Sequence, residues 1–342
     1  MPEFDDGLLD DPQALQDADG LLRPLAEAGA RLRRESDAAR DALALVTPDA
    51  RPRAVVAVGP EARLLRAVLE PTCPVPFVAW PNLGLPGWVG PLDVVVVLGG
   101  AGRTPSATVS EALRRGSRLI VTAPEDSPLA RQASSRATTL LPSRTSDPLC
   151  GAITTLMALH ALQLAGPADP AAIADAMDEV ATRCSLSRDI AGNPAKKNAL
   201  ELADGQPLIW GGSVLAARAS RRIAEAVRGA TGRVALSADA GALIPILAET
   251  RPRDPFEDPF EEQPVDRRPV LVVIEDGLGD EASDESREIL QSNADAADVH
   301  VVTIEHTAAS TMERYATVLQ EGLFSAAYLA IGGGRVRALA NR

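Results

Sequence analysis

Short apolar segments that alternate with helical segments constrain the fold of this chain more than any other feature of its sequence. The apolar segments are too short for helices, are mostly rich in valine, isoleucine and leucine, and are bounded by glycine and proline, as is typical of buried strands. In the first half, the strand candidates are 54–58, 76–80, 94–98, 119–122 and 138–141, and the helical candidates are 61–69, 106–115, 128–133 and 149–164. Apolar strands that alternate with helices predict a parallel sheet covered by helices on both faces.

The same plan recurs in the second half of the chain. Its strand candidates are 208–210, 233–237, 270–274 and 299–304, and its helical candidates are 214–228, 240–249, 284–294 and 310–331. We therefore predict an α/β protein with two parallel-sheet domains, each with the three layers αβα. The predicted organisation is an N-terminal helical segment 1–49, a first domain 50–165, a helical connector 166–204 and a second domain 205–342.

The segment 250–269 interrupts the regular pattern of the second half. It carries five prolines and the near-repeat Asp254-Pro255-Phe256-Glu257-Asp258-Pro259-Phe260-Glu261. A loop of this length is often functional, and a disordered excursion is the alternative. The sequence leaves its role open.

Composition and charge exclude several classes of partner. The formal net charge of −13 repels nucleic-acid phosphates and anionic lipids, so we predict neither a nucleic-acid nor a membrane partner. No apolar run approaches the ~20 residues of a membrane helix, and the acidic start of the chain is unlike a signal peptide. The three cysteines form no CxxC pair, so we expect reduced thiols and a cytoplasmic protein. The sequence has no metal-ligand, GxGxxG or Walker spacing, so we predict no metal and no cofactor.

A glycine-rich turn follows the strand candidate 94–98. It reads Gly99-Gly100-Ala101-Gly102-Arg103-Thr104-Pro105-Ser106 and leads directly into a helix. Ligands bind outside the carboxyl ends of parallel strands, where free backbone N–H groups and the positive end of a helix favour an anion. The predicted phosphate-binding residues are therefore Gly99, Gly100, Gly102, Arg103, Thr104 and Ser106. The alternative is a tight turn that only lets the strand and the helix pack together.

A second turn, Gly211-Gly212-Ser213, follows the strand candidate 208–210 and again opens a helix. We predict a second anion site here on the same grounds. The alternative is structural, with Ser213 as the N-cap of the helix.

His306 is the histidine best placed for catalysis. It closely follows the last strand candidate and has Glu305 beside it, so a ligand at the edge of the sheet would reach it. A surface histidine without a catalytic role is the alternative.

The segment from Val94 to Thr122, with its glycine-rich turn between a strand and a helix, resembles the sugar isomerase (SIS) domain. Further motifs are similar to the bifunctional phosphoglucose/phosphomannose isomerase family, which has tandem SIS domains. These motifs are Asn193-Pro194-Ala195-Lys196, Trp210-Gly211-Gly212-Ser213 and Gly322-Leu323-Phe324-Ser325-Ala326-Ala327-Tyr328-Leu329-Ala330. The opening Leu8-Leu9-Asp10-Asp11 resembles actinobacterial members of that group, and the whole resemblance covers about 50–332.

The resemblance implies a five-stranded, flavodoxin-like fold in each half, a dimer, and aldose–ketose interconversion of a 6-phosphosugar. The family's phosphate loop reads SxSGxTxET, whereas the fixed positions here hold Gly99, Ala101, Gly102, Thr104, Ser106 and Ala107. The chain also lacks the family's catalytic glutamate and histidine and its C-terminal lysine at the corresponding places. The family's arginine after the fifth strand corresponds to Arg144. The remaining candidates for acid–base chemistry are Glu249, and Glu305 with His306.

The predicted function is binding of a sugar phosphate, by a homodimer that the resemblance and the two Ala/Leu-rich closing helices favour. One form of this hypothesis is an isomerase that converts glucose or mannose 6-phosphate to fructose 6-phosphate. Isomerisation needs a base, and losing such a group costs ~10²–10⁴-fold in rate. A non-catalytic sugar-phosphate sensor or partner subunit is the alternative, and a purely structural interaction protein is the third hypothesis.

Overall fold

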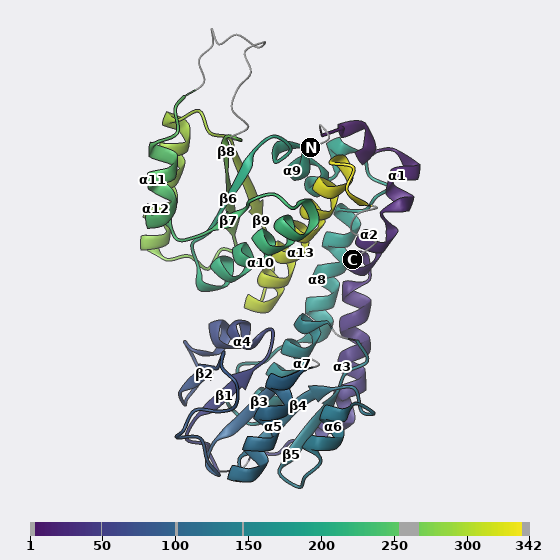
Figure 1. Cartoon of the computed structure of the whole chain (residues 1–342), viewed down its shortest axis with the longest axis vertical. Coiled ribbons are helices and arrows are strands. Elements are labelled where there is room, and N and C mark those ends of the chain that lie inside the picture. Colours follow the sequence, from purple (N-terminus) through teal and green to yellow (C-terminus); the bar gives the residue numbers. More distant parts are fainter. Residues whose placement is uncertain (1–3, 49, 100–101, 146, 253–266, 337–342) are drawn as a thin grey trace. The chain divides into compact units, whose positions relative to one another are not determined.

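The computed structural model describes residues 4–48, 50–99, 102–145, 147–252 and 267–336. The chain divides into two compact units, of which unit 1 comprises Met1–Ala28 and Asp175–Arg342 and unit 2 comprises Gly29–Ala174. Each unit contains one parallel sheet (Figure 1). This division assigns most of the predicted connector 166–204 to unit 1. The domain ranges given above stay predictions.

Unit 2 contains a five-stranded sheet with the strand order β2-β1-β3-β4-β5, in which every pairing is parallel. Its strands are β1 (Val55–Val58), β2 (Phe77–Ala79), β3 (Val94–Leu98), β4 (Arg118–Ala123) and β5 (Thr138–Pro142), and its helices are α3 (Ala28–Ala44), α4 (Ala62–Leu69), α5 (Arg103–Arg115), α6 (Pro128–Ala133) and α7 (Pro148–Ala161). The five strand candidates of the first half are therefore confirmed. Helix α5 begins three residues earlier than the sequence indicated, so Arg103, Thr104 and Ser106 lie in its first turns.

The central strands of unit 2 are buried because helices cover both faces of the sheet. Every residue of β1 and β3 is buried. On one face, Val95 and Val97 of β3 pack in a cluster with Val109 of α5 and Leu129 of α6. Helices α4 and α7 contact the strands from the other face. The predicted α/β fold with three layers is confirmed (Figure 1).

Unit 1 contains a parallel sheet with the order β7-β6-β8-β9. Its strands are β6 (Gln206–Gly211), β7 (Leu236–Ser237), β8 (Pro269–Glu275) and β9 (Val301–Glu305), and its helices are η1 (Asp6–Leu9), α1 (Pro12–Asp17), α2 (Asp19–Ala26), most of α8 (Pro170–Arg183), η2 (Ile190–Gly192), α9 (Pro194–Glu201), α10 (Val214–Thr231), α11 (Ala240–Ala248), α12 (Glu281–Ala296) and α13 (Thr311–Gly332). Helices α11 and α12 pack on one face of the sheet, and α10 and α13 contact its strands from the other.

The resemblance implied five strands in each half, and this is wrong for the described residues of unit 1, which form four. The cause is the connection after β9. The chain runs from Glu305 through a short segment directly into α13, which leaves no further strand–helix unit to supply a fifth strand.

Within its described residues, the predicted N-terminal helical segment 1–49 is divided into three α-helices, α1, α2 and α3. The breaks fall at Ala18 and Glu27, whose backbone N–H groups close the preceding helices by donating to the carbonyls of Ala14 and Arg23. Apolar spacing continues across both breaks, so periodicity alone does not reveal them.

Helix α13 is the central helix of unit 1. A capping box between Ser310 and Glu313 fixes its start, and most of its length is buried against α9, α10 and α2. Its faces are therefore covered by the same chain, so α13 no longer supports a dimer interface, and the homodimer stays a prediction. Within the described ranges, no helix combines the length and the apolar character needed to cross a membrane.

The three cysteines are free thiols, and two of them are buried. Burial raises the pKa of Cys184 to about 12, and the charge of Glu321 adds to this effect. Burial likewise raises the pKa of Cys150. Because the thiolate is the reactive form, a thiol reagent at pH 8 should label Cys73 alone in the native protein, and all three cysteines after unfolding. Rapid labelling of all three under native conditions would contradict this burial.

Candidate functional site

A cavity of about 520 Å³ lies at the carboxyl edge of the sheet in unit 2. Its walls come from the segments that follow the strands. Pro60 follows β1, Gly99 follows β3, Pro124 follows β4, and Arg144 follows β5. Strands β1 and β3 are neighbours in the sheet. The chain continues from β1 to β2 on one side of this pair and from β3 to β4 on the other side. Open parallel sheets bind their ligands at this kind of point.

The N-terminus of α5 opens at this cavity. Its N-cap is Gly102, which lines the cavity. Because glycine has no side chain, no side-chain oxygen accepts a hydrogen bond from the backbone N–H groups of the first turn. A Cβ atom added at Gly102 would meet no atom within 4 Å, so the space beside it is open. Two other helices have an N-cap residue that lines the cavity, and these are capped by Ser127 and Asp147. Among these three helices, α5 therefore presents its positive end without a side-chain cap.

Arg144 supplies the cavity with a positive charge. Its side chain is exposed, and its guanidinium has no ion pair or hydrogen bond to any residue that the structure describes. The cavity also has one acid, Asp147, which caps α7 and accepts a hydrogen bond of 2.7 Å from Arg31 Nε. That ion pair neutralises Asp147, so Arg144 determines the sign of the charge in the cavity.

Ser106 lines the cavity, but its hydroxyl is already engaged. It donates to Gln132 Oε1 at 2.9 Å, and Gln132 Nε2 returns a hydrogen bond of 2.9 Å to the Ser106 carbonyl. The role of Ser106 in phosphate binding therefore stays a prediction, and its hydroxyl would have to leave Gln132 to donate to a phosphate. Arg103 and Thr104 follow the N-cap in sequence but do not line the cavity. Gly100 lies outside the described residues.

The turn Gly211-Gly212-Ser213 in unit 1 has a different environment. Ser213 Oγ accepts a hydrogen bond of 2.9 Å from the Ala216 amide and so caps α10. The same hydroxyl donates to Asp276 Oδ2 at 2.5 Å. Asp276 is 2% exposed, and its carboxylate engages the hydroxyl that the predicted phosphate would use. These contacts favour the structural alternative for this turn.

Gly211 is required by close packing between β6 and α10. A Cβ atom at this position would lie 2.3 Å from the carbonyl carbon of Ala216. We expect Gly211→Ala to lower the free energy of unfolding by about 1–3 kcal/mol because the helix must move. In the control Gly229→Ala, the added methyl meets open space within α10, and we expect a gain of about 0.5–1 kcal/mol. Equal urea midpoints for the two variants would rule out this packing role.

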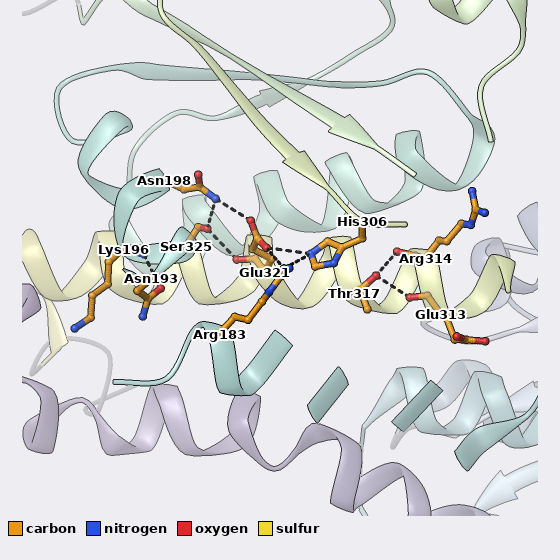
Figure 2. A network of polar contacts seen from close by, with 10 residues as sticks. All are labelled: Arg183, Asn193, Lys196, Asn198, His306, Glu313, Arg314, Thr317, Glu321 and Ser325. Atoms are coloured by element: carbon orange, nitrogen blue, oxygen red, sulfur yellow. Dashed lines mark hydrogen bonds and ion pairs between the residues drawn. The ribbon is translucent and has the colours of Figure 1, made fainter. Parts of the chain in front are cut away.

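His306 belongs to a buried polar network in unit 1 (Figure 2). Its Nε2 atom lies 3.0 Å from Glu321 Oε2. Arg183 Nη2 lies 3.0 Å from the same oxygen, and Asn198 donates to Glu321 Oε1 at 3.3 Å. The side chains of His306 and Glu321 are only 8% and 5% exposed. His306 is thus neither a surface histidine nor a partner of Glu305, whose side chain is exposed.

Glu249 lies far from Glu305 within unit 1. It ends α11, close to Arg251, whose carbonyl accepts a hydrogen bond of 2.8 Å from Arg268. Arg268 directly precedes β8, so Glu249 lies at the amino edge of the sheet, whereas Glu305 ends β9 at the carboxyl edge. The structure therefore does not bring Glu249 together with Glu305 and His306, and the candidate acid–base set is not assembled. Among the described residues, no group of three or more His, Cys, Asp or Glu side chains is suited to hold a metal.

Sequence reasoning missed Glu35, Asp147 and Gln132. Asp147 carried a usable signal, since an aspartate directly before a proline is typical of a helix start. Glu35 carried none, because its partner Arg144 lies 109 residues further along the chain.

Two parallel sheets with helices on both faces, and a cavity at the carboxyl edge of one, define a tandem α/β fold. No protein-family model matches the sequence, and no curated protein matches it. Solved structures do match. A glucose-6-phosphate isomerase-like protein from Thermus thermophilus shares 18% identity and a TM-score of 0.56, over 97% of this chain and 93% of that one.

Two more structures match to a similar extent. Tagatose-6-phosphate ketose/aldose isomerase from Escherichia coli has 12% identity and a TM-score of 0.60, over 93% of this chain and 92% of that one. The C-terminal domain of glucosamine-fructose-6-phosphate aminotransferase from Francisella tularensis has 11% identity and a TM-score of 0.58, over 92% and 96%. The chain therefore has the fold of the phosphosugar isomerases, as the sequence resemblance predicted.

Proposed function

We propose that the cavity of unit 2 binds a sugar phosphate. One observation supports this most strongly: the uncapped N-terminus of α5 and the unpaired Arg144 line the same cavity. Backbone N–H groups at a helix N-terminus favour an anion, and a guanidinium binds phosphate through two parallel hydrogen bonds. The cavity volume of about 520 Å³ is within the range of small-molecule sites.

The names of the structural neighbours support a phosphorylated sugar over other anions. They refer to glucose 6-phosphate, tagatose 6-phosphate and fructose 6-phosphate. We therefore infer a hexose phosphate as the ligand, with the phosphate at α5 and Arg144 and the sugar in the remainder of the cavity. Glucose, mannose and fructose 6-phosphate are the ligands to test first.

The cavity favours binding without rapid isomerisation. Moving a proton between two carbons of the sugar requires a general base of suitable pKa. Asp147 is the one carboxylate among the described residues that line the cavity, and its ion pair with Arg31 engages it. We therefore propose a sugar-phosphate sensor or partner subunit, with an isomerase as the second candidate.

Calorimetry combined with a coupled isomerase assay separates these candidates. We expect the protein to bind at least one of the three hexose 6-phosphates and not to bind unphosphorylated glucose. The same preparation should show little conversion of glucose or mannose 6-phosphate. Rapid conversion would establish the isomerase instead, and no binding of any phosphosugar would overturn the proposed function.

A further inference from the structure

Helix α3 contributes a buried carboxylate to the loop that carries Arg144. Glu35 is 2% exposed, and both of its carboxylate oxygens accept hydrogen bonds from the Arg144 backbone N–H, at 3.0 and 2.9 Å. Burying a carboxylate is costly unless hydrogen bonds or an ion pair compensate for the lost hydration. Glu35 contacts Arg144, which among the described residues that line the cavity is the one with an unpaired positive charge.

The same helix fixes this loop at a second point. Arg31, one turn before Glu35, donates through Nε to Asp147 Oδ2 at 2.7 Å. Arg144 and Asp147 are thus both held by one helix. A backbone position held in this way loses little conformational freedom when a ligand binds.

The geometry keeps the charge of Arg144 available. Glu35 contacts the backbone amide of Arg144, and within the described residues neither it nor any other acid pairs with the guanidinium. A carboxylate on the guanidinium itself would compete with a phosphate for the same donors. Glu35 therefore fixes the position of Arg144 without neutralising its charge.

We propose that Glu35 is a positioning residue for the anion site, acting through Arg144, an inference that rests on the proposed function of the cavity. Glu35→Gln keeps the shape of the side chain but leaves one acceptor in place of two, and the new amide group faces the Arg144 N–H. We expect it to weaken glucose 6-phosphate binding about 3- to 10-fold, in line with the loss of one hydrogen bond of ordinary strength.

The control is Asp37→Asn, which removes an equal charge from an exposed position on the same helix. It should leave the affinity unchanged. Affinities are measured by calorimetry below the melting temperature of each variant, so that a loss of stability alone does not change them. Glu35→Asp retains the charge but retracts the oxygens, and it should also weaken binding if the contact with Arg144 is what matters.

A double-mutant cycle with Arg144→Gln gives the decisive result. If Glu35 acts through Arg144, then Glu35→Gln should have no further effect on affinity in the Arg144→Gln background. Equal effects in both backgrounds, or wild-type affinity in both Glu35 variants, would overturn the inference while the proposed function stands. If the unsubstituted protein binds no phosphosugar, the proposed function fails first and the inference fails with it.

Discussion

Replacing Glu321 with alanine should lower the free energy of unfolding of the protein by about 1–3 kcal/mol, the range observed when buried polar groups lose their hydrogen-bond partner. Glu321 lies on α13 and holds Arg183 from α8, Asn198 from α9 and His306 from the end of β9 (Figure 2). Without its carboxylate, these groups lose their shared acceptor. The half-exposed Arg183 can bind water instead, but the buried His306 and Asn198 are left without this partner.

The unfolding free energy of this variant is measured by urea denaturation followed by circular dichroism. Glu305→Ala is the matched control, because Glu305 is the neighbour of His306 in sequence but its side chain is exposed. We expect the control to change stability by no more than about 0.5 kcal/mol. Similar urea midpoints for the two variants would mean that the Glu321 network does not stabilise unit 1.

Replacing Arg144 with glutamine should weaken binding of a hexose 6-phosphate by about 10- to 100-fold, since hydrogen bonds between charged groups contribute about 1.5–3 kcal/mol. The guanidinium is the positive side chain in the cavity that has no partner among the described residues. Because the side chain is exposed, its loss should leave the unfolding free energy within about 0.5 kcal/mol of the original.

The control for this variant is Arg136→Gln. Arg136 is exposed and lies just before β5, at the end opposite Arg144, so it carries the same charge at the other edge of the sheet. Calorimetric titrations of both variants distinguish a specific contact from a general change in net charge. A loss of affinity of equal size in the two variants would contradict a specific role for Arg144.

Most of the fold could be predicted from the sequence because its signals are local. The valines of β3 are buried on both faces, and an uninterrupted apolar run records that burial directly. The bounds of a strand were predicted less well where its length depends on the strand it pairs with. β7 covers only Leu236–Ser237 of the expected 233–237, because it pairs with β6 alone and only at these two residues.

The site could be predicted only in part. Gly99, Gly102 and Ser106 follow directly from the position of a glycine-rich turn after a buried strand, and the structure places all three at the cavity. Side-chain partners could not be predicted in the same way. Nothing local in the sequence indicates that Ser106 donates to Gln132 on another helix.

His306 shows the same limit from the other direction. The adjacent Glu305 suggested a catalytic pair with His306. The partner of the His306 ring is instead Glu321, which lies 15 residues later in the sequence. Neighbouring side chains in an extended segment point to opposite sides, so Glu305 points away from His306. Helix α13 follows this segment and brings Glu321 into contact with the His306 ring. Proximity in sequence was therefore a poor guide to the chemistry of this histidine.

A crystal structure of the protein soaked with fructose 6-phosphate tests the central claim most directly. The account predicts density for the sugar phosphate in the cavity of unit 2, with the phosphate within hydrogen-bond distance of the first backbone N–H groups of α5 and of the Arg144 guanidinium. Density for the phosphate at Gly211-Gly212-Ser213 in unit 1, or an empty cavity in crystals soaked at millimolar ligand, would contradict it.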